Sequence, residues 1–449
     1  MKIRKLIAIS LGVTMLASFA ACTPQTTEPA TTQPISSDET SAAVASETTG
    51  SDTTISFSWW GGDERHNATL DAIAAFEAQN PGIKVDSQYA AWTGWEEAMA
   101  TKFFSNTAPD MNQINWNWIS QFSGDGSKFA DINQYSNIID LTQFDQASLD
   151  QCFVADKLQA VPVSMTGRIF YWNKTTFDNA GIETPNSLED LYAAADAFKS
   201  NLGEDYFPLV MGEYDRAILL PYYLESKYGK AWVENNVLQY SVEEIADGLQ
   251  FFSDLEAGGV IPTIQMVTGD GAESLDKNPK WINGRYAGIF EWDSSATKFR
   301  DALDGEQEFV VGNYFADLGE SQGGFAKVSL AFAISESSQN KEACAQLMEY
   351  LLNDDTGTAI LGSQRGIPLS KKAIANTDSK GLLDPLVKEA NEKVLAWVKF
   401  PLDPKFEDAR LKNTDGTYYD AFSGLSYGDY DAQTAAQILA DGINAVLAS

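Results

Sequence analysis

Aromatic residues stand beside carboxylates and amides in several short segments of the chain. These segments are Trp60 with Glu64, Trp92, Trp116-Asn117-Trp118, Glu213-Tyr214-Asp215 and Glu291-Trp292-Asp293. An aromatic ring offers a flat apolar face at little entropic cost, while carboxylates and amides offer fixed hydrogen-bonding groups. A pyranose has matching surfaces, because one face carries C–H groups and the rim carries hydroxyls that must be paired when buried. The residue types therefore predict non-covalent binding of a sugar ring.

Composition argues against several other classes of partner. The 449 residues include 63 acidic and 31 basic side chains, and the net charge is −32. Nucleic acids and anionic membrane surfaces are bound by clustered Lys and Arg, so neither is expected as a partner. One histidine and three scattered cysteines do not supply a metal site, and no cofactor is expected. The length predicts two or more core-forming units.

The N-terminus has the features of an export signal followed by a tether. Residues 1–21 contain three early basic residues and a short apolar stretch, which is typical of a secretory signal peptide. The signal ends at Phe19-Ala20-Ala21-Cys22, which resembles the bacterial lipobox, although that pattern prefers Leu at the position of Phe19. An ordinary cleaved signal with an incidental cysteine is the alternative. Residues 22–54 are rich in Thr and Ser and predict a disordered tether behind a lipidated Cys22.

The tether is followed by strands that alternate with helices. The expected elements are a strand at 55–59, a helix at 67–79, a strand at 83–87, a helix from a capping box at 93–96 to about 104, and a strand at 111–115. This order predicts a mainly parallel α/β sheet, in which ligands bind outside the carboxyl ends of the strands. A tryptophan follows each of the three strands, which favours Trp60, Trp92, Trp116 and Trp118 as ligand platforms.

Further elements are expected along the second half of the chain. Strands are predicted at 168–173, 287–292 and 325–334, and helices at 187–199, 240–258, 341–352 and 432–447. Four other tryptophans, Trp59, Trp232, Trp281 and Trp397, are interpreted as core residues. Cys152 and Cys344 are either free buried thiols or, since secretion permits it, a disulfide pair.

Longer segments resemble a known protein family. They include "SFSWWGGDERHNATLDAIAAFEAQNPGIKVD", "RIFYWNKTTFDNAGIETP", "WINGRYAGIFEW" and "GIPLSKKA". Together with the lipobox and the tether, residues 55–449 resemble the extracellular solute-binding lipoproteins of carbohydrate ABC importers, the family 1 sugar-binding proteins. The second and third segments are the most specific parts of this resemblance.

The resemblance implies an α/β fold of the periplasmic-binding-protein type II, with two lobes that close on a ligand like a Venus flytrap. The N-terminal lobe would comprise 55–163 plus 327–367, and the C-terminal lobe 164–326 plus 368–449. The hinge crossings would lie near 162–167, 322–328 and 366–372. Matching positions imply roles in ligand binding for Trp292, Trp60, Glu64, Gly324 and Arg365.

The function implied is the capture of a sugar, expected to be an oligosaccharide, at the extracellular face of the bacterial cell membrane. A lipid-anchored monomer would deliver the sugar to the transmembrane permease of an ABC transporter, without covalent chemistry. A secreted glycoside hydrolase is one alternative, since acidic residues are plentiful and two carboxylates about 5–10 Å apart would suffice. A binder of peptides or of another non-sugar solute is the other.

Overall fold

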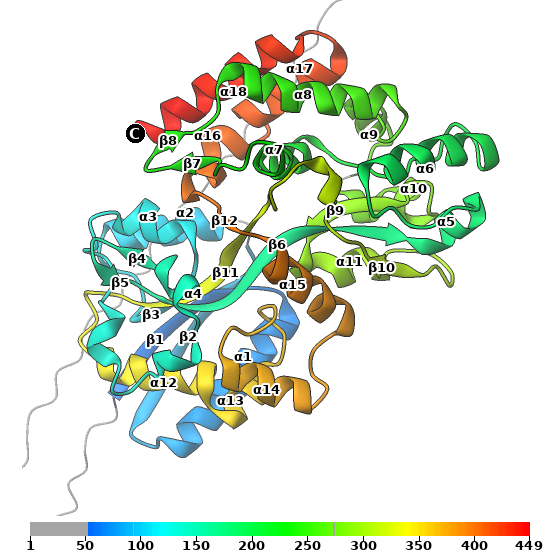
Figure 1. Ribbon diagram of the computed structural model, residues 1–449. Helices are drawn as coiled ribbons and strands as arrows, with labels where there is room; N and C mark the ends of the chain where they lie inside the picture. Colours follow the sequence, from blue (N-terminus) through cyan, green and yellow to red (C-terminus); the bar gives the residue numbers. More distant parts are fainter. Residues whose placement is uncertain (1–52, 93, 273) are drawn as a thin grey trace, which may run out of the picture. The chain divides into compact units, whose positions relative to one another are not determined.

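Figure 1 shows the computed structural model, which describes residues 53–92, 94–272 and 274–449. The predicted signal peptide, the lipidation site Cys22 and nearly all of the predicted tether lie outside these residues. All of the described residues belong to one compact unit. Within the described residues, no helix has the length and apolar character needed to cross a membrane.

The structure mixes short and long strands with many helices. The principal strands are β1 (Thr53–Trp60), β2 (Ile83–Ala90), β3 (Met111–Asn115), β6 (Val161–Asn173), β9 (Gly288–Trp292), β10 (Phe309–Val311), β11 (Phe325–Ile334) and β12 (Phe400–Pro401). Two small hairpins are formed by β4 (Phe153–Val154) with β5 (Lys157–Leu158), and by β7 (Val233–Glu234) with β8 (Val237–Leu238).

The α-helices fall into two sets along the chain. The first set is α1 (Asp63–Gln79), α2 (Trp95–Phe104), α3 (Asn117–Ser123), α4 (Gln146–Asp150), α5 (Lys174–Ala180), α6 (Leu188–Asn201), α7 (Glu213–Tyr228), α8 (Val242–Ala257), α9 (Ile264–Gly269), α10 (Pro279–Ile282) and α11 (Ala296–Asp301). The second set is α12 (Lys341–Asn353), α13 (Asp355–Leu361), α14 (Lys371–Ser379), α15 (Pro385–Trp397), α16 (Ala409–Lys412), α17 (Thr417–Tyr427) and α18 (Ala432–Leu447).

Among the described residues, the eight principal strands form one mixed sheet. Its path runs β10-β6-β11-β3-β1-β2, with β9 paired to β6 and β12 paired to β11. The N-terminal strands β1, β2 and β3 are parallel, whereas β11 runs antiparallel to both β3 and β6. The long strands β6 and β11 therefore join the parallel strands at one end of the sheet to β9 and β10 at the other.

The predicted β-α-β-α-β order of the first segment is confirmed. Ile55 and Phe57 of β1 are buried in the core. The helix α1 ends at Gln79 and is capped by Asn80, directly before Pro81 and Gly82. The helix α2 begins at Trp95, and its N-cap is Gly94. The predicted cap, Thr93, lies outside the described residues. The parallel strands thus end side by side, where β1, β2 and β3 lead into Trp60, Trp92 and Trp116.

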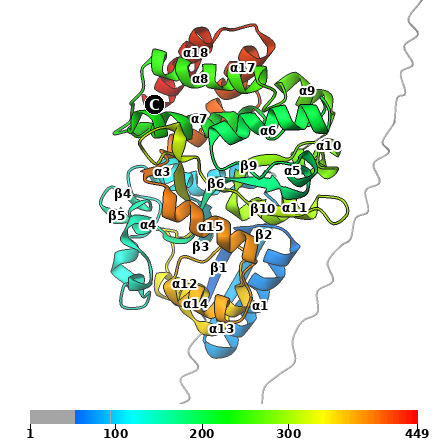
Figure 2. The ribbon, with the colours of Figure 1, turned by 45° about the vertical axis from the view of Figure 1, so that its right-hand side comes forward.

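The helices gather around the two ends of the sheet (Figures 1 and 2). In both views α1, α12, α13 and α14 lie beside β1–β3, and α13 contacts α1, α12 and α14. In both views α8, α17 and α18 lie together on the other side of β6, and α18 packs on α8 and α17. The α/β fold class expected from the sequence is confirmed. The expectation of a mainly parallel sheet is wrong, because β6 and β11 pair antiparallel with each other, β6 pairs antiparallel with β9 and β10, and β11 pairs antiparallel with β3.

The interpretation of the remaining tryptophans and cysteines also holds. Trp59, Trp232 and Trp281 are buried in the core, and Trp397 packs against it partly buried. Cys152 and Cys344 are free and buried, so the question left open by the sequence resolves to two thiols. Burial raises the pKa of each thiol to about 12.

Candidate functional site

Three of the strand-end tryptophans form one aromatic cluster, which we call the Trp60–Trp92–Trp118 cluster. The ring centroid of Trp60 lies 5.1 Å from that of Trp92 and 5.3 Å from that of Trp118, and the rings of Trp92 and Trp118 stack at 6.1 Å. Trp60 and Trp118 are buried, whereas Trp92 is 42% exposed. Trp92 therefore presents the accessible ring face, and the two buried indoles support it from within the protein.

A second cluster combines aromatic rings with buried cations. The Lys327 ammonium lies between two indoles, 5.3 Å from the ring of Trp116 and 5.0 Å from the ring of Trp292. On β6, directly opposite Trp292 of β9, the Arg168 guanidinium lies 5.1 Å from the Trp292 ring and 5.9 Å from the Tyr214 ring. We call these residues, with their carboxylate partners, the charged aromatic cluster. It links residues that follow β3 to residues at the end of β9.

Each buried cation of the charged aromatic cluster is paired with carboxylates. The Arg168 guanidinium lies 2.5 Å from Asp215 and 3.5 Å from Glu291, and these two charges raise its pKa against the opposing effect of burial. The Lys327 ammonium donates to Glu407 at the end of η6 (Pro404–Glu407). Burial lowers the pKa of Lys327, whereas the attraction of Lys327 lowers the pKa of Glu407 below its usual value despite burial.

These carboxylates are held in place with acceptor capacity left over. A carboxylate has about four lone-pair sites. Glu407 accepts two hydrogen bonds, from the Lys327 ammonium and from the Tyr214 hydroxyl 3.5 Å away. Glu291 accepts from the backbone N–H of Trp292 at 2.7 Å. Burial raises the pKa of Glu291. The cluster thus offers oriented acceptors next to the half-buried rings of Trp292 and Tyr214 and the buried ring of Trp116.

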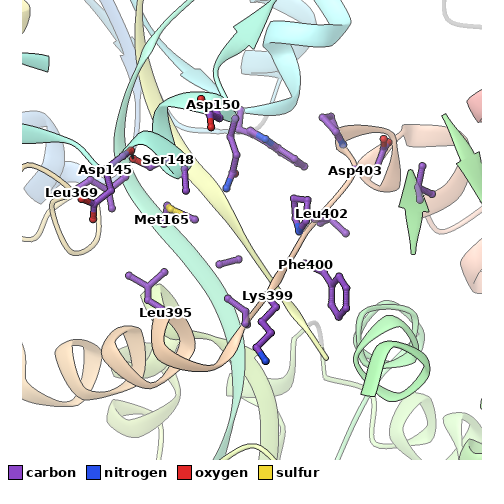
Figure 3. A pocket seen from close by; sticks show the side chains of 18 residues that line it. Asp145, Ser148, Asp150, Met165, Leu369, Leu395, Lys399, Phe400, Leu402 and Asp403 are labelled. Atoms are coloured by element: carbon purple, nitrogen blue, oxygen red, sulfur yellow. Dashed lines mark hydrogen bonds between the residues drawn. The ribbon is translucent and has the colours of Figure 1, made fainter. Parts of the chain in front are cut away.

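A cavity of about 720 Å³ adjoins this cluster (Figure 3). It lies beside β6, β11 and β12, between α4 and the end of α15, and Trp116 is part of its lining. Its apolar lining includes Met165, Leu369, Leu395 and Phe400, and its polar lining includes Asp145, Asp150, Lys399 and Asp403. A volume of this size and a mostly apolar wall with a few polar groups are typical of small-molecule sites.

The other residues proposed from the sequence lie in different surroundings. Glu64 is exposed in the first turn of α1. Asn117 is buried, and its side-chain oxygen has no hydrogen-bond partner among the described residues. Glu213 accepts from the Ser423 hydroxyl at 2.9 Å, which ties α7 to α17.

Asp293, Gly324 and Arg365 make internal contacts. The Asp293 carboxylate accepts from the Thr166 hydroxyl and from the Asn391 amide, and burial raises its pKa to about 6. The backbone N–H of Gly324 donates to the buried Glu225 carboxylate at 2.9 Å. Arg365 is buried against Gln113 and Thr69. The charged aromatic cluster therefore gathers five of the residues proposed from the sequence, namely Trp116, Tyr214, Asp215, Glu291 and Trp292. Asp293, Gly324 and Arg365 have their hydrogen-bond partners outside this cluster.

Sequence reasoning missed Arg168, Lys327 and Glu407, and it missed most of the cavity lining. Lys327 carried a signal, since a lysine inside the apolar run 325–334 has to find a partner when the strand is buried. Glu407 carried none, because it lies 80 residues away in a short polar turn. Among the described residues, no group of three His, Cys, Asp or Glu side chains is arranged to hold a metal ion.

Comparison with known proteins places the chain in a family. The model of the bacterial extracellular solute-binding proteins matches residues 62–358, and the chain belongs to that family. A periplasmic solute-binding protein of Pectobacterium atrosepticum is 32% identical, with a TM-score of 0.82, covering 88% of this chain and 99% of that one. An oligogalacturonide-binding protein of Yersinia enterocolitica, solved with saturated digalacturonic acid, is 31% identical, with a TM-score of 0.78 and coverages of 88% and 99%.

The curated relatives match a shorter part of the chain. An ABC-transporter extracellular-binding protein of Pyrococcus horikoshii is 24% identical over 155 residues, which are 34% of this chain and 36% of that protein. Binding proteins of Brucella match over 38% of their own length. The solved structures show that the fold is that of the type II periplasmic binding proteins, as expected from the sequence.

Proposed function

We propose that this protein captures an oligosaccharide outside the bacterial cell and delivers it to the permease of an ABC importer. The observation that carries the proposal is the charged aromatic cluster. There, Trp116 and Trp292 flank the buried Lys327, and Asp215, Glu291 and Glu407 are fixed beside them. Aromatic faces beside fixed carboxylates suit a ligand with C–H faces and hydroxyl donors.

The size of the site supports a ligand of more than one sugar unit. The Trp60–Trp92–Trp118 cluster, the charged aromatic cluster and the cavity beside Trp116 provide several separate surfaces, and a single ring can use only one or two of them. The ligand of the Yersinia relative, a digalacturonic acid, is an oligosaccharide of this kind and belongs in any test panel.

The mode of capture is closure of two lobes. In this proposal 55–163 plus 327–367 form one lobe and 164–326 plus 368–449 the other. The long strands β6 and β11 run between the two parts of the sheet, which suits hinge crossings near 162–167 and 322–328. A ligand that contacts both lobes binds the closed state better than the open state and shifts the equilibrium toward closure.

The location in this proposal is the outer face of the cell membrane. Cleavage after residue 21 and diacylation of Cys22 would supply two acyl chains, which suffice for stable anchoring where one chain is marginal. Residues 23–54 would then hold the binding unit outside the membrane. Metabolic labelling with a palmitate analogue tests whether Cys22 is acylated. We expect the parent protein to be labelled and the Cys22→Ala variant to remain unlabelled.

Binding itself is tested by a thermal-shift screen against neutral plant, host and storage oligosaccharides and oligogalacturonides. A ligand at 100 times its Kd should add about 2.7 kcal/mol to the stability of the folded protein. The screen is repeated with Trp292→Ala and with Tyr427→Ala, which removes an aromatic residue that is 50% exposed on α17. We expect the shift to disappear in the first variant and to persist in the second. A well-folded protein that responds to no sugar would overturn the proposal.

A further inference from the structure

Two arginines beside the end of β1 lack the carboxylate partners that buried arginines usually have. Arg365 is 5% exposed and Arg65 is half-buried, and among the described residues neither forms an ion pair. Burial lowers the pKa of both guanidiniums, and the charge of Arg65 lowers that of Arg365 further. Burying a guanidinium without a counter-charge is unfavourable. The neutral acceptors around Arg365 compensate only in part, since its Nη1 has no hydrogen-bond partner among the described residues.

Those acceptors form a hydrogen-bonded chain that leads to Trp60. Arg365 Nε donates to Gln113 Oε1 at 2.8 Å, and Gln113 Nε2 donates to the backbone carbonyl of Trp60 at 3.1 Å. Arg65 Nη1 donates to the same carbonyl at 3.1 Å. The last residue of β1 is therefore held from two sides by side chains that come from β3 and from α1.

The same arginines are fixed to the chain segment that follows α13. Arg65 Nε donates to the carbonyl of Gln364 at 2.8 Å, and the carbonyl of Arg365 accepts from the Ser164 hydroxyl at 2.6 Å. Leu369 N–H donates to the carbonyl of Val163 at 3.0 Å. Residues 364–369 are thus bound both to β6, beside the proposed hinge crossings, and to the end of β1.

We propose that Arg365 is a positioning residue for ligand binding. Through Gln113 it fixes the carbonyl of Trp60, and so it fixes the indole of Trp60 on which the exposed ring of Trp92 rests. Arg365 itself does not contact the ligand, because it is buried. The segment 364–369 and the accessible face of Trp92 are coupled by this chain, so a change at one is transmitted to the other. This inference rests on the proposed function only where ligand affinity is measured.

The decisive variant is Gln113→Glu. Its carboxylate still accepts from Arg365 Nε and adds the missing counter-charge, so the fold should keep or gain stability. It has no N–H to donate to the carbonyl of Trp60, so the contact from Gln113 is lost while Arg65 Nη1 still donates to that carbonyl. If Arg365 and Gln113 only stabilise the fold, this variant binds ligand as the parent does. Arg365→Lys keeps the charge but cannot reach Gln113 and Thr69 together, and serves as the second variant.

The first readout needs no ligand. Fluorine NMR of the protein labelled with 5-fluorotryptophan reports on each indole, with resonances assigned by Trp→Phe replacements. In Gln113→Glu and Arg365→Lys we expect the resonances of Trp60, Trp92 and Trp118 to shift or broaden, while that of Trp281 stays unchanged. Unchanged resonances of the Trp60–Trp92–Trp118 cluster in both variants, at unchanged melting temperature, would overturn the inference.

The second readout is the affinity for whichever sugar gives a shift in the thermal screen. Loss of the contact to Trp60 should weaken binding about tenfold in Gln113→Glu without lowering the melting temperature. An exposed-site control, Arg410→Gln, should bind as the parent does. A parent that binds no sugar contradicts the proposed function, whereas the NMR result still decides the positioning role. Parental affinity in Gln113→Glu contradicts the positioning role alone.

Discussion

Replacing one partner of the Lys327–Glu407 pair should destabilise the fold far more than replacing both. The side chains of Lys327 and Glu407 are only 9% and 6% exposed, so either charge left alone is buried without its main partner. Removing one partner of a buried pair costs about 3–5 kcal/mol. Lys412, 4.0 Å from Glu407, compensates part of the loss in Lys327→Met, which places that variant near the lower end of the range.

The double variant, Lys327→Met with Glu407→Gln, removes both charges and should lie within about 1 kcal/mol of the parent. Urea unfolding followed by circular dichroism measures the two single variants and the double variant, and the coupling in the double-mutant cycle should be about 5 kcal/mol or more. The buried pairing of Lys327 with Glu407 would be contradicted by either of two results. One is that each single variant lowers the free energy of unfolding by less than about 1 kcal/mol, and the other is that the double variant is as unstable as the sum of the singles. A stable double variant also allows ligand binding to be measured without the ammonium between Trp116 and Trp292.

Three further outcomes are expected. Burial raises the pKa of Asp293 to about 6, so ionisation of Asp293 disfavours the folded state, and stability due to this group is lost as pH rises from about 4 through 6. The difference in stability between the parent and Asp293→Asn should change by up to about 3 kcal/mol over this window, and a pH-independent difference would contradict the burial argument. Gly167→Ala should destabilise by about 1–3 kcal/mol in urea unfolding, because a Cβ on β6 would lie 2.4 Å from Val394 Cγ1 and 2.8 Å from the carbonyl of Phe325; parental stability would show that α15 can move away. Trp292→Ala should weaken sugar binding at least about tenfold in calorimetry, since an aromatic platform is lost, and unchanged affinity would remove Trp292 from the site.

Local patterns were sufficient to predict the first strands and helices, whereas the fold type came from the family resemblance. The alternation in 55–59 and the helical spacing up to Pro81-Gly82 depend on neighbouring residues only, and β1, α1, β2, α2 and β3 follow as expected. The run 325–334 likewise matches β11. Such patterns reflect which face of an element is buried, and this information is present in a single sequence.

The arrangement of side chains at the site could be predicted only in part. The parallel order implied that the residues after β1, β2 and β3 meet, and Trp60, Trp92 and Trp118 do meet. Which of these indoles stays exposed depends on packing by α2 and α3, and no local pattern encodes it. The Lys327–Glu407 pair joins positions 80 residues apart, so only the tertiary structure shows it.

The roles assigned to Gly324 and Arg365 came from resemblance, and the structure gives both residues internal partners. Gly324 has φ +92°, a left-handed conformation that favours glycine, and its N–H is occupied by Glu225. Among the described residues, Arg365 donates through Nε and Nη2 to neutral acceptors, and its buried Nη1 has no hydrogen-bond partner. A match to a family position therefore predicts where a residue lies in the fold better than it predicts whether that residue contacts ligand.

We propose above that the charged aromatic cluster binds an oligosaccharide. Isothermal titration calorimetry of the protein with digalacturonate and with neutral oligosaccharides of two to four units tests it most directly. We expect saturable binding of one ligand per chain for at least one of these sugars, loss of that binding in Trp292→Ala, and unchanged binding in Tyr427→Ala. Absence of binding to every sugar by a folded protein, or equal binding by the Trp292→Ala variant, would contradict it.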